Sequence, residues 1–119
     1  MKNNKIKVSK FFQMGGVVEF WLQKRLHFMG VPDCIYATSP ESFAKATEQL
    51  DDITQKIMEQ FGRVMAPPDI VKIRVRLDNE LYAVDCASWY QLCLKFRHEE
   101  GYVYVIPDKV DVHFKEHRL

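Results

Sequence analysis

The chain has 119 residues, of which 47% are hydrophobic and 28% charged, with 17 basic against 16 acidic side chains. This length is typical of one domain, so residues 1–119 are expected to form a single domain, and the apolar content is sufficient for a core without disulfides or metal. The composition argues against a disordered chain and a globally basic nucleic-acid binder, and no stretch approaches the roughly 20 apolar residues of a membrane-spanning helix.

The charge is unevenly distributed along the chain. Residues 1–30 carry six basic side chains and one acidic, a net charge of +5, whereas residues 31–69 carry three basic and seven acidic, a net charge of −4. Such a split can orient one copy against another, or against a partner. The lysine-rich N-terminus lacks a continuous apolar run, so no signal peptide is expected, and three cysteines favour free thiols in the cytoplasm.

Residues 17–29 fit two kinds of structure. Gly30 stands where a helix would end, and we predict a helix over 17–29. The competing pattern is a strand, whose apolar face would include Val18, Phe20 and Leu22. The helix would also place Arg25 inside its apolar arc, which is unfavourable. In the strand alternative, the glycine pair at 15–16 can turn a hairpin from the preceding KIKVSKFFQ.

The strongest predicted element is a helix from Pro40 to Phe61. Ser39 supplies an N-cap hydroxyl, Pro40 takes the first helical position, where its missing N–H costs nothing, and Gly62 is the expected stop. Apolar side chains recur every three or four residues. They predict one buried stripe, which consists of Phe43, Ala46, Leu50, Ile53, Ile57 and Phe61.

Residues 69–85, DIVKIRVRLDNELYAVD, predict a β-hairpin. Apolar side chains alternate with Lys72, Arg74 and Arg76, so the cations share one face of the strand over 70–77. A two-residue turn at Asp-Asn pairs Val75 with Tyr82 and places that ring in the core. A three-residue loop would instead place the ring beside the arginines.

The last third of the chain is predicted to form mainly strands. Alternation of apolar and polar residues predicts a strand over 90–97, although a helix that begins behind Asp85 fits the same short run, and periodicity alone does not separate them. Further strands are predicted at 102–106 and 109–114. The fold class is therefore α+β: an antiparallel sheet with the helix at 40–61 packed on one face, and a second helix at 17–29.

A basic sheet face is the first candidate site. If the segments 5–7, 72–76 and 95–97 are neighbouring strands in phase, seven cations share one face. Such a face can bind phosphates, and Tyr82, Trp89 or Tyr90 can stack on bases. This alternative function, a nucleic-acid-binding module, depends on Lys72, Arg74, Arg76, Lys95 and Arg97. The same row of cations is also expected if these side chains only keep the uncovered face of the sheet in contact with water. Basic residues on edge strands also prevent the sheet from pairing with another sheet. Cations gathered on one open face favour nucleic acid, and scattered cations favour a protein partner.

Catalytic motifs are sparse. The sequence has no Gly-rich phosphate loop, no G-x-S-x-G and no paired C-x-x-C. His113 to His117 match H-x-x-E-H, but VDVHF predicts a strand, whereas zinc peptidases carry that motif on a helix. The gap between Cys86 and Cys93 is too wide for a usual zinc knuckle with these histidines. We therefore predict no enzyme, no metal site and no cofactor, and identify no small-molecule substrate.

The aromatic content suggests a second candidate site. Fifteen of 119 residues are aromatic, and some must reach the surface of so small a domain. An exposed apolar patch, which usually marks a partner surface, is predicted from Phe11, Phe12, Trp89 and Tyr90. The favoured function is a non-enzymatic protein-binding or assembly subunit, which docks on a partner or on a second copy through this patch and the split charge.

Overall fold

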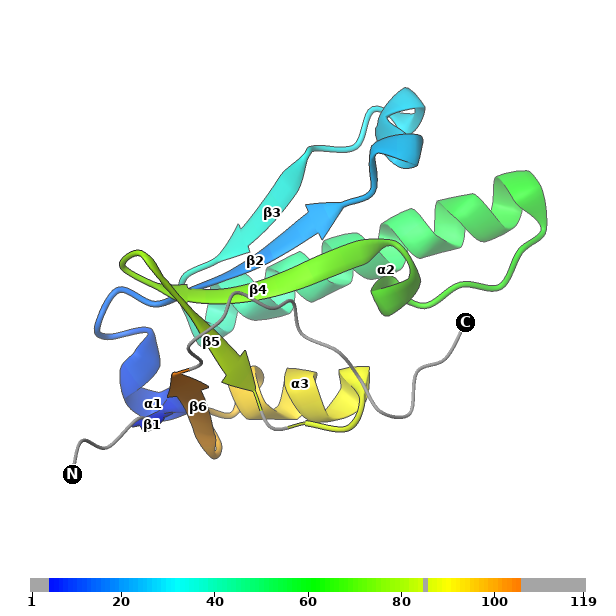
Figure 1. The fold of residues 1–119 in the computed structure, drawn as a ribbon. Helices are drawn as coiled ribbons and strands as arrows, with labels where there is room; N and C mark the ends of the chain where they lie inside the picture. The colour runs from blue at the N-terminus through cyan, green and yellow to red at the C-terminus, as the bar shows by residue number, and fades with distance from the viewer. Residues whose placement is uncertain (1–4, 85, 106–119) are drawn as a thin grey trace.

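The computed structural model describes residues 5–84 and 86–105, and its six strands form one antiparallel sheet in the order β1-β6-β5-β4-β2-β3 (Figure 1). The elements in chain order are β1 (Lys5–Lys7), α1 (Val8–Phe11), β2 (Val17–Leu22), the 3₁₀ helix η1 (Lys24–Met29), β3 (Cys34–Ala37), α2 (Pro40–Phe61), the 3₁₀ turn η2 (Pro67–Asp69), β4 (Val71–Leu77), β5 (Glu80–Val84), α3 (Trp89–Arg97) and β6 (Tyr102–Val105). The predicted α+β class is confirmed, with the long helix against one face of the sheet.

Helix α2 has the predicted bounds and caps. The Ser39 hydroxyl accepts a hydrogen bond from the Ser42 N–H at 3.1 Å, and the Ser42 hydroxyl accepts one from the Ser39 N–H at 2.9 Å. This reciprocal capping box satisfies donors that the first turn leaves open. Gly62 has a φ of 66° and ends the helix in the left-handed region.

Residues 17–22 form strand β2, so the prediction of a helix over 17–29 is wrong. The strand is hydrogen-bonded to β3 along one edge and to β4 along the other, and its alternate side chains are buried against the helices. Two consecutive valines favour extended backbone, and the two partner strands supply hydrogen bonds that the local sequence does not reveal. Gly30, with a φ of 76°, ends η1 instead of a long helix. Strand β1 pairs with β6 and not with β2, so KIKVSKFFQ forms no hairpin with the residues after it.

The predicted hairpin of β4 and β5 is confirmed. Leu77 pairs with Glu80 across a two-residue turn, and Asp78 in that turn has a φ of 55°. Val75 pairs with Tyr82, whose side chain is buried in the core. The two-residue loop therefore sets the register, as expected.

Residues 89–97 form helix α3, so the predicted strand over 90–97 is wrong and the helical alternative is confirmed. Its N-cap is Ser88, whose hydroxyl accepts from the Gln91 N–H at 3.2 Å; the cap predicted from sequence, Asp85, lies outside the described residues. Strand β6 confirms the prediction at 102–106 within the described residues, and the strand predicted at 109–114 lies outside them.

Aromatic rings join the helices to the sheet in one core. Phe96 of α3 stacks on Phe43 of α2, with ring centroids 5.3 Å apart, and Phe43 lies 5.6 Å from Phe20 of β2. Phe11 of α1 contacts Phe96 edge to face, with ring centroids 6.0 Å apart. All four rings are fully buried. In helix α3, one face carries Trp89, Leu92, Cys93 and Phe96 into the core, whereas a strand would place Trp89 and Cys93 on the face opposite Leu92 and Phe96.

Candidate interaction surfaces

The three cations of β4 lie on the face of the sheet opposite α2. Lys72, Arg74 and Arg76 alternate with side chains buried under the helices, and they pair in register with Trp21, Glu19 and Val17 of β2. The predicted layered arrangement is therefore present: α2 covers one face, and the basic residues of β4 belong to the other.

Lys95 and Arg97 do not join this basic face, which corrects the predicted set of five. Both residues belong to α3, on the helical side of the sheet. The Arg97 guanidinium donates a hydrogen bond to the Thr47 hydroxyl of α2 at 2.6 Å. Lys5 and Lys7 also lie apart, since β6 and β5 separate β1 from β4. The predicted row of seven cations is divided among three places.

The predicted aromatic patch is also divided. Phe11 is fully buried and Phe12 is half-buried against Phe96, at 5.8 Å between ring centroids. Trp89 is half-buried and lies 6.0 Å from Phe20. Tyr90 alone of the four is largely exposed, at 69%, and it lies at the end of α3 that is remote from α1 (Figure 1). These four residues therefore do not form one docking surface.

The outer face of β2, β3 and β4 carries a hydrogen-bonded group of side chains. The Trp21 indole N–H donates to one carboxylate oxygen of Glu19 at 2.9 Å, and Arg76 Nε lies 3.8 Å from the other oxygen. The Glu19 side chain is only 12% exposed. Beside Trp21 is a groove of about 480 Å³ whose lining includes Lys24, Lys72 and Arg74.

A second surface lies where the C-terminal end of α2 extends past the sheet (Figure 1). Phe28 of η1 is 71% exposed and Phe61 of α2 is 53% exposed, and their rings meet edge to face with centroids 6.1 Å apart. Met58 and Val64 are exposed nearby in sequence. We call these four residues the apolar tip. Phe61 was expected in the buried stripe of α2, and its exposure corrects that prediction.

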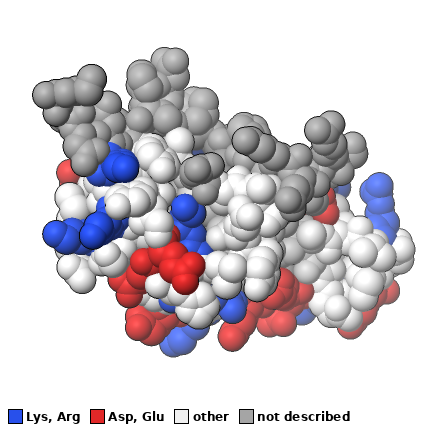
Figure 2. All heavy atoms as spheres, turned by 90° about the horizontal axis from the view of Figure 1, so that it is seen from below, with Lys and Arg blue, Asp and Glu red and all other residues white. Residues whose placement is uncertain are grey.

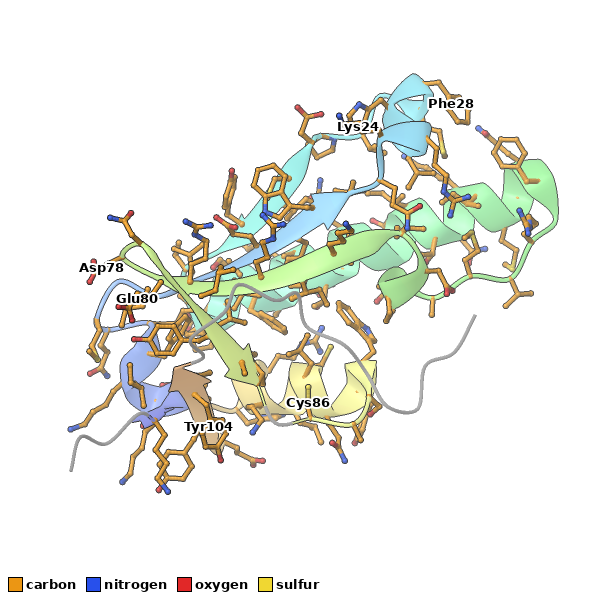
Figure 3. All side chains as sticks on the ribbon, in the orientation of Figure 1. Lys24, Phe28, Asp78, Glu80, Cys86 and Tyr104 are labelled. Carbon is orange, nitrogen blue, oxygen red and sulfur yellow. The ribbon has the colours of Figure 1, made fainter. Side chains whose placement is uncertain are left out.

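The apolar tip borders a small groove with basic walls. The groove has a volume of about 210 Å³, and its lining comprises Arg25, Leu26, Phe28, Ile57, Phe61, Arg63 and Met65. Leu26 and Ile57 are buried core residues, so the rigid core supports the groove. Phe28, labelled in Figure 3, projects from η1 beside the end of α2.

Within the described residues, the basic N-terminal segment does not gather in one place. The first 30 residues place Lys5, Lys7 and Lys10 at the end that carries β1 and α1, whereas Lys24 and Arg25 belong to η1 at the opposite end (Figure 1). Figure 2 shows basic side chains at the β1 and α1 end and acidic side chains in the lower part of the view. The basic segment is therefore continuous in sequence but divided in space.

Two of the three cysteines have a raised pKa. All three lie in the described part of the chain and are thiols without a disulfide. Burial raises the pKa of the Cys93 thiol to about 11, although Arg97 lowers it in part, and burial also raises the pKa of Cys34. A raised pKa reduces the thiolate fraction that a nucleophile or a metal ligand needs.

Metal ligands and membrane helices are not found in the parts that are described. Within residues 5–84 and 86–105, no three histidine, cysteine or acidic side chains gather as a metal site, and no helix there is apolar over enough length to cross a bilayer. The H-x-x-E-H segment, with His113 and His117, lies outside these residues.

The chain was compared with protein-family models, with curated proteins and with solved structures, and none of the three comparisons gives a match. The surfaces themselves are therefore the basis for assigning a function. The residues that sequence reasoning missed are Phe28 and Phe61 of the apolar tip, and Trp21 of β2 and Tyr36 of β3, two exposed aromatic residues on the outer face of the sheet. The strand pattern of residues 17–22 was the signal for Trp21, since it places that residue opposite the buried face.

Proposed function

We propose that this protein is a non-enzymatic protein-binding module, and that its apolar tip receives an apolar side chain from an acidic segment of a partner protein. The observation that carries the proposal is the contact of two exposed phenylalanine rings, Phe28 and Phe61, at the end of α2. Contiguous exposed apolar surface of this kind usually marks an interaction site, and aromatic side chains are enriched among residues that dominate binding energy.

The lining of the groove determines which side chains of a partner can fit it. Its floor includes the buried side chains of Leu26 and Ile57, so an inserted aliphatic or aromatic side chain would be removed from water on several sides. Arg25 and Arg63 line the same groove. Their charge favours aspartate or glutamate beside the inserted side chain and disfavours basic partners.

The thiol state of the cysteines supports a cytoplasmic location for this module. Reduced cysteines are usual in compartments that glutathione and thioredoxin keep reducing. Three thiols in one small domain, none of them in a disulfide, agree with that environment.

The test is a selection from a displayed library of random peptides, followed by affinity measurements with the selected peptides. We expect enrichment of a large apolar residue flanked by acidic residues. Phe28→Ala with Phe61→Ala should reduce affinity at least tenfold, since truncation of a central anchor costs about 2 kcal/mol or more. Met14→Ala with Tyr90→Ala is the matched control, because both residues are exposed and neither lines the tip groove.

Charge reversal tests the acidic part of the proposal. Arg25→Glu with Arg63→Glu should weaken binding, whereas Lys45→Glu with Lys56→Glu, an equal change at exposed positions of α2, should not. Enriched peptides without acidic residues, or peptides that bind the phenylalanine double variant as well as the wild type, would reject the proposal. A homodimer that the same double variant dissociates would also reject it, since the occupant would then be a second copy.

A further inference from the structure

The outer face of β2, β3 and β4 has features that the protein-binding proposal does not use. Two aromatic side chains project from it: Trp21 of β2 is 36% exposed and Tyr36 of β3 is 54% exposed. Trp21 pairs with Cys34, so Tyr36 is its diagonal neighbour across the strands. Diagonal neighbours lie about 7–8 Å apart, so the two residues project from neighbouring strands on one face of the sheet.

The Trp21 ring is held in place by its neighbours. Glu19 accepts the indole N–H at 2.9 Å and also faces Arg76 at 3.8 Å. Because the Glu19 side chain is nearly buried, this carboxylate is a fixed support for the ring. A platform that is already ordered loses little side-chain entropy when a planar ligand stacks on it.

Cations surround the platform. Lys72 is directly opposite Trp21, and Arg74 is directly opposite Glu19. Lys24, labelled in Figure 3, begins η1 just beyond β2. All three line the groove of about 480 Å³ beside the indole. Among the described residues, Arg76 adds a fourth cation to this surface, and Glu19 adds a carboxylate.

We propose that this face binds single-stranded nucleic acid, with bases stacked on Trp21 and Tyr36 and the backbone phosphates beside Lys24, Lys72 and Arg74. Exposed aromatic residues on a sheet, each stacking one base, are a recurring way to hold single strands. Stacking tolerates any base, and the cations attract the backbone by releasing condensed counterions. A duplex offers no unstacked base to these rings, so the preferred ligand is single-stranded.

Fluorescence anisotropy with labelled oligothymidylate and oligouridylate of about 12 nucleotides tests the proposal, and the two oligomers separate DNA from RNA. We expect a Kd of about 1–100 μM. Trp21→Ala and Tyr36→Ala should each weaken binding about five- to a hundredfold. Tyr90→Ala, which removes an exposed ring from α3, is the matched control and should change the Kd less than about twofold.

A second set of measurements separates the contribution of charge to binding from that of base stacking. Lys72→Glu with Arg74→Glu should weaken binding at least about tenfold and reduce the slope of log affinity against log salt by about 1.4, since about 0.7 is lost per phosphate contact. Lys45→Glu with Lys56→Glu is the control of equal charge on α2. Poly-glutamate, an anionic polymer without bases, should compete poorly.

Three outcomes would overturn the proposal. They are the absence of binding by either oligomer at about 50 mM salt, equal losses in the face variants and their controls, and competition by poly-glutamate as strong as that by unlabelled oligomer. Circular dichroism of each variant identifies loss of fold. Tyr36→Ala is expected to fold in any case, because that side chain is more than half exposed.

Discussion

The two ends of helix α2 have the same apolar pattern and different surroundings. Near the N-terminal end, Phe43 is fully buried between Phe20 of the sheet and Phe96 of α3. At the C-terminal end, Phe61 continues the same stripe but is 53% exposed and has Phe28 as its aromatic neighbour. Periodicity thus predicts which way a side chain points, whereas burial also depends on whether another element covers it. Phe43 is therefore part of the core, whereas the Phe61 ring remains half exposed at the surface.

The largest difference in stability is expected between alanine variants of these two phenylalanines. Phe43→Ala should reduce the free energy of unfolding by about 3–5 kcal/mol, because it opens a cavity among packed rings. Phe61→Ala should reduce it by less than about 1 kcal/mol, since the lost ring is already half in water. Urea denaturation measures both values. Equal losses would show that the two ends are equally packed, contrary to the comparison.

Replacement of two glycines by alanine gives the next largest loss of stability. A Cβ at Gly16 would collide with the Phe11 ring, which is itself fully buried, so Gly16→Ala should cost about 1–3 kcal/mol through overpacking. Gly62 follows α2 at the exposed end and has open space around it, but its φ is 66°. Gly62→Ala should therefore cost about 1 kcal/mol from backbone strain alone. A larger cost at Gly62 than at Gly16 in thermal denaturation would reverse this order.

Near neutral pH the smallest effect on stability comes from the Cys93 thiol, because its contribution changes only above about pH 9. The Cys93 thiol has its pKa raised by burial from 9.0 to about 11. The unfolded chain therefore loses this proton at a lower pH than the folded chain, and stability falls as the pH rises from about 9 to 11. Cys93→Ala should remove part of that slope in urea denaturation curves. An identical slope in the variant would show that Cys93 does not cause this pH dependence. As a second test, alkylation of Cys93 near neutral pH should be slower in the folded than in the unfolded protein.

The elements that the sequence predicts well are those whose signals are complete within a short segment. Helix α2 carries its own cap, stop and long apolar period, and the hairpin of β4 and β5 carries its turn between two alternating runs. Residues 17–22 lack such signals, and residues 89–97 have only the Ser88 cap. An apolar run of that length fits a helix or a strand. Their structures depend on partners distant in sequence: β4 for β2, and Phe43 for α3.

The candidate surfaces were less predictable than the fold. Lys72, Arg74 and Arg76 were placed correctly on one face, because strand alternation alone determines it. Lys95 and Arg97 were misplaced together with α3. Phe28 and Phe61 were missed because their exposure depends on where the sheet ends relative to α2, and no local pattern records that.

The central claim is that the apolar tip contributes to binding and little to folding. The most direct measurement compares wild type with the Phe28→Ala and Phe61→Ala double variant, with the free energy of unfolding and the affinity for a selected acidic-apolar peptide measured on the same preparations. We predict a stability loss below about 1 kcal/mol together with an affinity loss of at least tenfold. A stability loss above about 3 kcal/mol, typical of core residues, or an unchanged affinity would contradict the claim.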